Sequence, residues 1–105
     1  MTPEEEFFEY VKQNPQYYSV MRAPVYMNIL NQLKQQALDV SELKGKTQVE
    51  EQDLDLILQS LEQLGLVEEI ELKNRVLYSL SVEGETFLDK YEKGFKVFGQ
   101  SEPSI

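Results

Sequence analysis

The sequence contains neither histidine nor cysteine, and these two absences exclude several classes of function. Histidine is the commonest general base and the commonest metal ligand. Cysteine supplies thiolate nucleophiles and structural disulfides. The five glycines are isolated from one another, so there is no glycine-rich phosphate loop. We therefore expect a protein that is not an enzyme, with no catalytic residue, no cofactor and no metal site.

Long apolar runs are also missing. No stretch approaches the roughly 18 residues that a membrane-spanning helix requires, and residues 1–6 are acidic where a secretion signal would be basic. We expect a cytoplasmic protein that does not enter a membrane. The 105 residues suit one small domain, and six tyrosines and five phenylalanines among 41% apolar residues provide for a real core.

Basic residues are absent from one particular segment. Residues 47–72 contain eight carboxylates and no Lys or Arg, which accounts for eight of the nine net negative charges. Residues 1–46 and 73–105 are each close to neutral. Affinity for nucleic acid is largely neutralisation of phosphate, so residues 47–72 are poorly suited to a DNA contact. An acidic surface suits a protein partner, in particular a basic one.

Capping residues and hydrophobic periodicity predict four helices in the first two thirds of the chain. Thr2 and Glu5 form a capping box for a helix over 3–13. A second helix is expected from about 24 to 36, and a brief third one begins after a cap at Ser41 and ends at Gly45. The fourth opens at 47 or 48 and ends at Gly65. Its apolar stripe has helical spacing and consists of Leu54, Ile57, Leu58, Leu61 and Leu64.

Two short strands and a last helix are expected after Gly65. In residues 66–72, apolar and acidic residues alternate at Ile70 and Leu72, which predicts a half-buried strand, with one face toward the core. Residues 73–75 form a turn and 76–80 return as a second strand, which completes a hairpin. Ser81 caps a final helix over 81–99, and 100–105 form a flexible tail. One domain over 1–99 is expected, in which 24–80 is the central part.

The order of these elements and three local phrases resemble the winged helix-turn-helix superfamily of bacterial and archaeal repressors. Residues 38–43 (LDVSEL) are similar to the lead into the first helix of the turn motif. Residues 58–67 (LQSLEQLGLV) resemble the end of a recognition helix that runs into the wing. Residues 78–84 (YSLSVEG) resemble the phrase that leaves the wing. The resemblance implies a mainly α fold with a small β-hairpin, carrying extra N- and C-terminal helices.

In DNA-binding members of this superfamily, the exposed face of the long helix enters the major groove. Here that face is acidic, and like charges repel more strongly in a partly desolvated groove than in water. We therefore favour a protein-interaction or regulatory module. The expected contact surface consists of Glu50, Glu51, Asp53, Asp55, Gln59 and Glu62.

The alternative is a dimeric transcriptional regulator that contacts DNA mainly through basic residues of the turn and the wing. These residues are Lys44, Lys46, Lys73 and Arg75. Such contacts give weak binding that declines steeply with salt. A third hypothesis is a protein that mimics DNA, because a row of carboxylates can replace phosphates.

The terminal helices carry more aromatic residues than a core of this size requires, which predicts a homodimer formed through them. The competing interpretation is that both helices close the domain's own core. The expected dimer contacts are Phe7, Phe8, Tyr10, Phe87, Tyr91 and Phe95.

Overall fold

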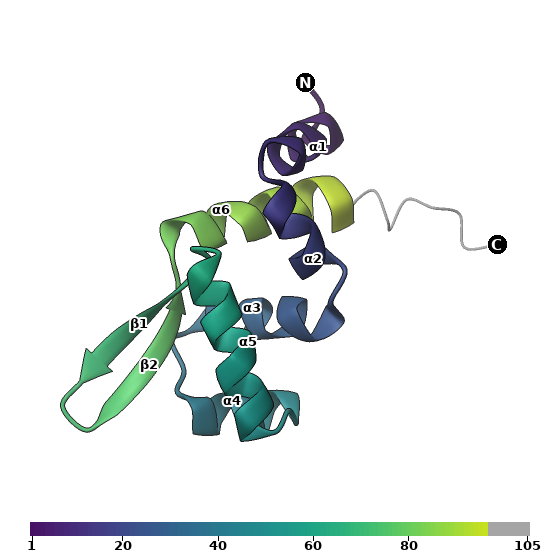
Figure 1. Cartoon of the computed structure of the whole chain (residues 1–105). Coiled ribbons are helices and arrows are strands. Elements are labelled where there is room, and N and C mark those ends of the chain that lie inside the picture. Colours follow the sequence, from purple (N-terminus) through teal and green to yellow (C-terminus); the bar gives the residue numbers. More distant parts are fainter. Residues whose placement is uncertain (97–105) are drawn as a thin grey trace.

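The computed structural model describes the backbone of residues 1–96 and the side chains of residues 1–94. Six α-helices, two short helical turns and one hairpin make up this described part (Figure 1). The expected end of the last helix at Gly99 and the expected tail over 100–105 lie outside it. The elements are α1 (Pro3–Gln13), η1 (Pro15–Tyr17), α2 (Tyr18–Met21), α3 (Pro24–Gln35), α4 (Val40–Thr47), α5 (Glu51–Gln63), β1 (Val67–Leu72), β2 (Arg75–Leu80), α6 (Val82–Lys90) and η2 (Tyr91–Lys96).

Helix α1 begins and ends where the sequence predicts. The Thr2 hydroxyl accepts a hydrogen bond from the Glu5 backbone N–H at 3.2 Å, and the Glu5 carboxylate accepts one from the Thr2 N–H at 3.3 Å. This capping box satisfies two donors that the helix cannot. Phe7 and Val11 form the buried side of the helix.

The segment between α1 and α3 packs down on the core, because Tyr17 and Val20 are both buried. It does so as the 3₁₀ turn η1 followed by the four-residue helix α2. In α3 the buried residues are Met27, Ile29, Leu30 and Leu33, whereas Val25 in the first turn is 42% exposed.

The boundary between α4 and α5 differs from the prediction. Asp39, not Ser41, caps α4: its carboxylate accepts from the Glu42 N–H at 2.8 Å, and Glu42 accepts from the Asp39 N–H at 3.0 Å. The helix therefore starts earlier than expected. It also continues through Gly45, where the sequence predicts its end. It stops at Gln48, which has a left-handed φ of 63°. The long helix α5 consequently starts at Glu51, not at 47 or 48.

Strands β1 and β2 form the expected antiparallel hairpin, in which Glu69 faces Tyr78. Leu38 adds a third, single-residue strand: its N–H donates to the Tyr78 carbonyl at 3.0 Å, and it accepts from the Tyr78 N–H at 2.7 Å. The outer half of the hairpin projects from the body (Figure 1). For this reason Ile70 and Leu72 are 39% and 49% exposed, and only Val67 of β1 is buried, so the expectation of a strand with one buried face is wrong.

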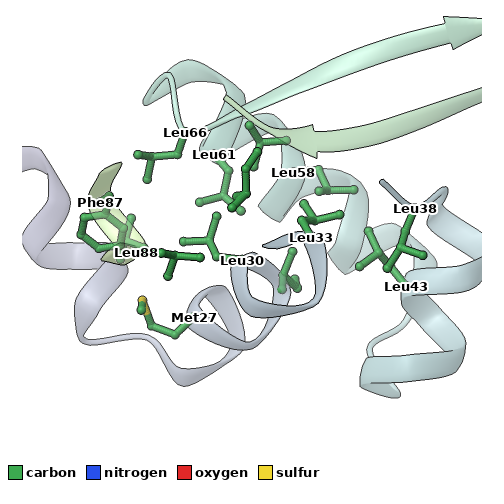
Figure 2. Close-up of a cluster of buried hydrophobic side chains, with 14 of the residues drawn as sticks. Met27, Leu30, Leu33, Leu38, Leu43, Leu58, Leu61, Leu66, Phe87 and Leu88 are labelled. Atoms are coloured by element: carbon green, nitrogen blue, oxygen red, sulfur yellow. The ribbon is translucent and has the colours of Figure 1, made fainter. Parts of the chain in front are cut away.

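The core lies between α3, α5, α6 and the start of the hairpin (Figure 2). Leu58 and Leu61 project from α5 toward Leu30 and Leu33 of α3, as Figure 2 shows. Within the predicted stripe of α5, three leucines are buried and two residues are half-buried. The buried ones are Leu54, Leu58 and Leu61, and the half-buried ones are Ile57 and Leu64.

Two glycines permit close approaches that hold the C-terminal helix in place. The predicted Ser81 cap of α6 is confirmed, with the Ser81 hydroxyl accepting from the Gly84 N–H at 3.0 Å. A Cβ on Gly84 would lie 2.1 Å from the Leu66 carbonyl oxygen. A Cβ on Gly94 in η2 would lie 2.5 Å from the Phe7 Cβ. Helix α1 thus packs directly on the backbone of η2.

Candidate functional site

The predicted protein-contact residues lie on the outer side of α5. The leucine stripe of this helix packs into the core, so the remaining side chains of the helix face away from the core. Residues that are exposed here are Glu50, Glu51, Asp53, Asp55 and Gln59, whereas Glu62 is half-buried. Leu56 is also 64% exposed on this side. Strand β1 lies against the C-terminal part of α5 and adds three more exposed carboxylates, Glu68, Glu69 and Glu71.

Glu62 and Glu69 bring the acidic charges of α5 and β1 together. Burial raises the pKa of Glu62, and the hydrogen bond and negative charge of Glu69 raise it further. The junction between the long helix and the wing is therefore a site of concentrated negative charge.

Tyr78 lies at the same junction. Its ring is half-buried against the core, opposite Glu69 in the hairpin register. Partial burial raises the pKa of the Tyr78 phenol, and the charges of Glu69, Glu62 and Asp55 act in the same direction. Chemically, an aromatic ring with carboxylates around it repels phosphate and suits a cationic group.

The predicted DNA-contact residues fall into two groups. Lys46 and Lys73 are exposed, and no ion pair is recorded for either within residues 1–96. Lys44 lies 4.0 Å from the Glu50 carboxylate. Arg75 is ion-paired, because one nitrogen of its guanidinium contacts both Asp39 and Glu42 at 2.7 Å, while 47% of its side chain stays exposed. The four cations therefore do not form one free basic patch.

The predicted dimer contacts are mostly used within the protomer. Phe7 and Phe87 are buried in its core, so they were wrongly offered as surface for a second copy. Tyr91 packs edge-on against Phe7, with ring centroids 5.9 Å apart. The Tyr10 hydroxyl donates to the Glu83 carboxylate. The competing interpretation, that the terminal helices close the domain's own core, therefore applies to these residues.

Phe8 is the exception among the predicted dimer contacts, because 58% of its surface is exposed on α1. Tyr18 of α2 is a second large aromatic that is exposed, at 47%. The side chain of Phe95 lies outside the described residues.

Burial raises the pKa of Tyr10, and the hydrogen bond and charge of Glu83 raise it further. The Lys90 Nζ lies 5.6 Å from the centroid of the Tyr10 ring, within the range of a cation–π contact. This group ties α1 to α6 and has the features of a structural contact.

The sequence interpretation missed Asp39, Glu42 and Tyr78. The Asp39–Glu42 pair has the spacing of a capping box, which is visible in the sequence. Its second role, as the partner of a wing arginine, depends on how the hairpin folds back toward α4. Tyr78 carries no signal of its own, because an aromatic residue in a strand most often belongs to the core.

The described residues give no geometric support for a metal site or a membrane-spanning helix, and the pocket lined by Lys34 has an ion pair at its edge. A pocket of about 300 Å³ is lined by Lys34, Glu85, Leu88 and Asp89, and Lys34 there pairs with Glu92 at 2.7 Å. Across residues 1–96, no three acidic side chains are grouped in a way that would hold a metal ion. Nor does any helix in this range combine the length and the apolar character needed to cross a membrane.

No family model and no curated protein matches this chain. Solved structures do match its fold. A putative MarR-family transcriptional regulator from Enterococcus faecalis V583 is similar with a TM-score of 0.74 and 22% identity, over 87% of this chain and 84% of that one. The homodimeric winged helix-turn-helix DNA-binding domain of Mb0332 from Mycobacterium bovis, a possible ArsR-family regulator, matches with a TM-score of 0.71 and 18% identity, over 92% of each chain.

A third structure, HlyU from Vibrio cholerae N16961, matches with a TM-score of 0.62 and 26% identity, over 69% of this chain and 79% of that one. The arrangement of α3, α4, α5 and the hairpin is thus a winged helix-turn-helix. The predicted fold class is confirmed: mainly helical, with a two-stranded antiparallel wing and additional helices at both ends.

Proposed function

We propose that this chain is a non-enzymatic, homodimeric winged-helix regulator of transcription that contacts DNA mainly through basic residues of the turn and the wing. The observation that carries the proposal is the fold. It is shared over nearly the whole chain with proteins described as transcriptional regulators, one of them a homodimeric DNA-binding domain. This proposal is the alternative of the sequence interpretation, and the solved structures support it better than a module that binds only proteins.

The charges of the described residues support a particular mode of binding. Asp53 and Asp55 lie exposed in the N-terminal half of α5, which is the half that enters the groove in conventional readers. The α5 surface therefore repels phosphate. Lys46, at the end of α4, and Lys73, at the wing tip, are exposed cations outside this helix. Contacts of this kind position a protein on the duplex without reading its sequence.

Dimerisation is part of the proposal because a few lysines per protomer give little affinity. Two protomers double the number of phosphate contacts, and each contact adds about 0.9 to the slope of log affinity against log salt. We propose that Phe8 and Tyr18, which are exposed on α1 and α2, contribute to the contact between the two copies.

Two measurements test the proposal. Sedimentation equilibrium at tens of micromolar should give twice the 12.3 kDa chain mass. Fluorescence anisotropy with a random duplex at about 20–50 mM salt should detect weak binding that declines steeply with salt. Lys46→Ala with Lys73→Ala should abolish most of this binding, whereas Lys12→Ala, which removes a charge from α1, should not. A monomer with no affinity for DNA at low salt would contradict the proposal.

A second candidate, a module that binds a basic protein segment, is favoured by the acidic surface itself. Eight carboxylates lie on α5 and β1 or just before α5, and Leu56 and Ile70 are exposed near them. Titration with a lysine-rich amphipathic peptide, followed by NMR, should then shift the signals of Gln59 and Leu56. Binding that persists after Asp55→Asn and Glu62→Gln would contradict this candidate.

A further inference from the structure

Arg75, the first residue of β2, is held by two carboxylates of another element. One nitrogen of its guanidinium donates to the Asp39 Oδ2 at 2.7 Å and to the Glu42 Oε1 at 2.7 Å. Both acceptors belong to the first turn of α4 and its cap. The wing therefore makes a direct ionic contact with the helix that precedes the long helix, which we call the acid clasp (Asp39, Glu42 and Arg75).

The carboxylates of the clasp are held in place by hydrogen bonds that do not involve Arg75. Asp39 uses its Oδ1 to accept from the Glu42 N–H, which leaves Oδ2 for the guanidinium. Glu42 accepts from the Asp39 N–H with the same Oε1 that receives Arg75. The hydrogen bond from the Glu42 backbone lowers the pKa of Asp39, and Arg75 lowers it further. Both side chains are therefore anchored as well as charged.

The backbone holds the third member of the clasp in reach. Three residues after Arg75, Tyr78 pairs with Leu38 through two hydrogen bonds, and Leu38 directly precedes Asp39. This pairing brings the start of β2 alongside the start of α4. An ordinary surface ion pair must order two mobile side chains and is worth little. Here the acceptors and the backbone on both sides are already positioned.

We propose that the acid clasp is autoinhibitory: Asp39 and Glu42 occupy the Arg75 guanidinium in place of a DNA phosphate. The inference rests on the proposed DNA-binding function. Two carboxylates offer arginine the planar oxygen acceptors that a phosphate also offers. While the clasp is closed, one Arg75 nitrogen is occupied by carboxylates, and Lys73 is the wing cation with no recorded ion pair among the described side chains. When it opens, Arg75 becomes available for one further phosphate contact in each protomer.

The clasp can be removed without removing the helix cap. Asn caps a helix as well as Asp does, and Gln at the third position completes a capping box as Glu does. The double variant Asp39→Asn with Glu42→Gln therefore keeps the cap and loses the ionic contact. A matched control is Glu51→Gln with Asp53→Asn, which removes two carboxylates from the first turn of α5, where no Arg75 contact is recorded. Circular dichroism checks that helix content is unchanged.

Duplex binding is then measured against salt for the wild type, the clasp variant, the control, and the clasp variant combined with Arg75→Ala. We expect the clasp variant to bind about tenfold more tightly at low salt. Its slope of log affinity against log salt should be steeper by about one for each protomer, the signature of one additional phosphate contact. The control should bind more tightly through reduced repulsion alone, with its slope unchanged. Adding Arg75→Ala should return the slope to that of the wild type.

Three outcomes overturn the inference in distinguishable ways. In the first outcome, the clasp variant and the control have the same slope of log affinity against log salt. In the second, the clasp variant keeps its steeper slope after Arg75→Ala. Either result means that the regulator binds DNA but that the clasp does not withhold Arg75. If neither the wild type nor the clasp variant binds duplex at about 20 mM salt, where electrostatic binding is strongest, both the clasp and the proposed function fail. Binding by the clasp variant alone supports both.

Discussion

Two leucine side chains of α5 that are only two residues apart differ in burial. Leu58 is 1% exposed and contacts the core, whereas Leu56 points to solvent. In a helix, residues two apart lie on nearly opposite sides. The stripe predicted from spacing therefore separates the structural side of α5 from the candidate contact side.

Leu58→Ala should destabilise the protein by about 2–5 kcal/mol, because it removes buried methyl groups and leaves a cavity. Leu56→Ala in the same helix should change stability by less than about 0.5 kcal/mol. Urea unfolding followed by circular dichroism measures both. Equal losses for the two variants would contradict the position of α5.

Glu62 should give stability an identifiable pH dependence. Burial, and then Glu69, raise the pKa of Glu62. The folded state therefore holds the proton more tightly than the unfolded state. This contribution to stability is fully present below the ordinary glutamate pKa of about 4.3 and is lost as the pH rises through the folded value.

Glu62→Gln removes this titration, so the stability of the variant relative to the wild type should increase between pH 4 and pH 7. Urea titrations across that range measure the difference. Glu68→Gln, which removes a charge from β1 without altering the Glu62–Glu69 pair, controls for net charge. The same pH response in both variants would show that the pair has no special role.

At the scale of elements, the sequence specified most of the helices and the hairpin because their signals are local. The Thr2 capping box, the Gly65 stop, which has a φ of 79°, and the Ser81 cap all act within a few residues. The start of α4 was misplaced because two caps competed, and only Asp39 forms a complete box with Glu42. Its end was misplaced because the left-handed residue that stops it is Gln48 and not Gly45. The exposure of Ile70 and Leu72 depends on where the hairpin points, which no local pattern encodes.

The candidate site was predictable only in part, for the same reason. Spacing placed the carboxylates of α5 on its outer side. That Glu62 meets Glu69, and that Arg75 meets Asp39, follows from contacts between elements distant in sequence. The aromatic surplus of the terminal helices was assigned to a dimer because the packing of α1 on η2 could not be seen.

The packing of α1 on η2 gives a test at this scale. Gly94→Ala should loosen α1, because the new methyl group would lie 2.5 Å from the Phe7 Cβ and 2.7 Å from the Pro3 carbonyl oxygen. We expect a loss of about 1–3 kcal/mol, as for other overpacked sites. Gly45→Ala is the control, because a Cβ there meets nothing within 4 Å and should stabilise α4. Hydrogen exchange should show faster exchange in α1 for Gly94→Ala alone.

The whole molecule has two separate candidate surfaces, one for DNA and one for a second copy of the chain. The exposed aromatics Phe8 and Tyr18 are the ones proposed to meet a second copy. Phe8→Ser with Tyr18→Ser should shift sedimentation from a dimer to a monomer and leave the monomer folded, since neither residue is buried. Val82→Ser, which changes another exposed apolar side chain, should leave the dimer intact. A dimer that survives the double variant would place the contact elsewhere.

In the proposed function, DNA is held by turn and wing cations and is not read by the acidic helix. Genomic fragments selected on the protein provide the probe, and a mobility shift at about 150 mM salt compares two sets of variants. We expect weak binding with little sequence preference, which is lost on replacing Lys46 and Lys73 and is unaffected by Gln52→Ala or Gln59→Ala. Nanomolar, sequence-selective binding that falls when Gln52, Asp55 or Gln59 is changed would contradict it.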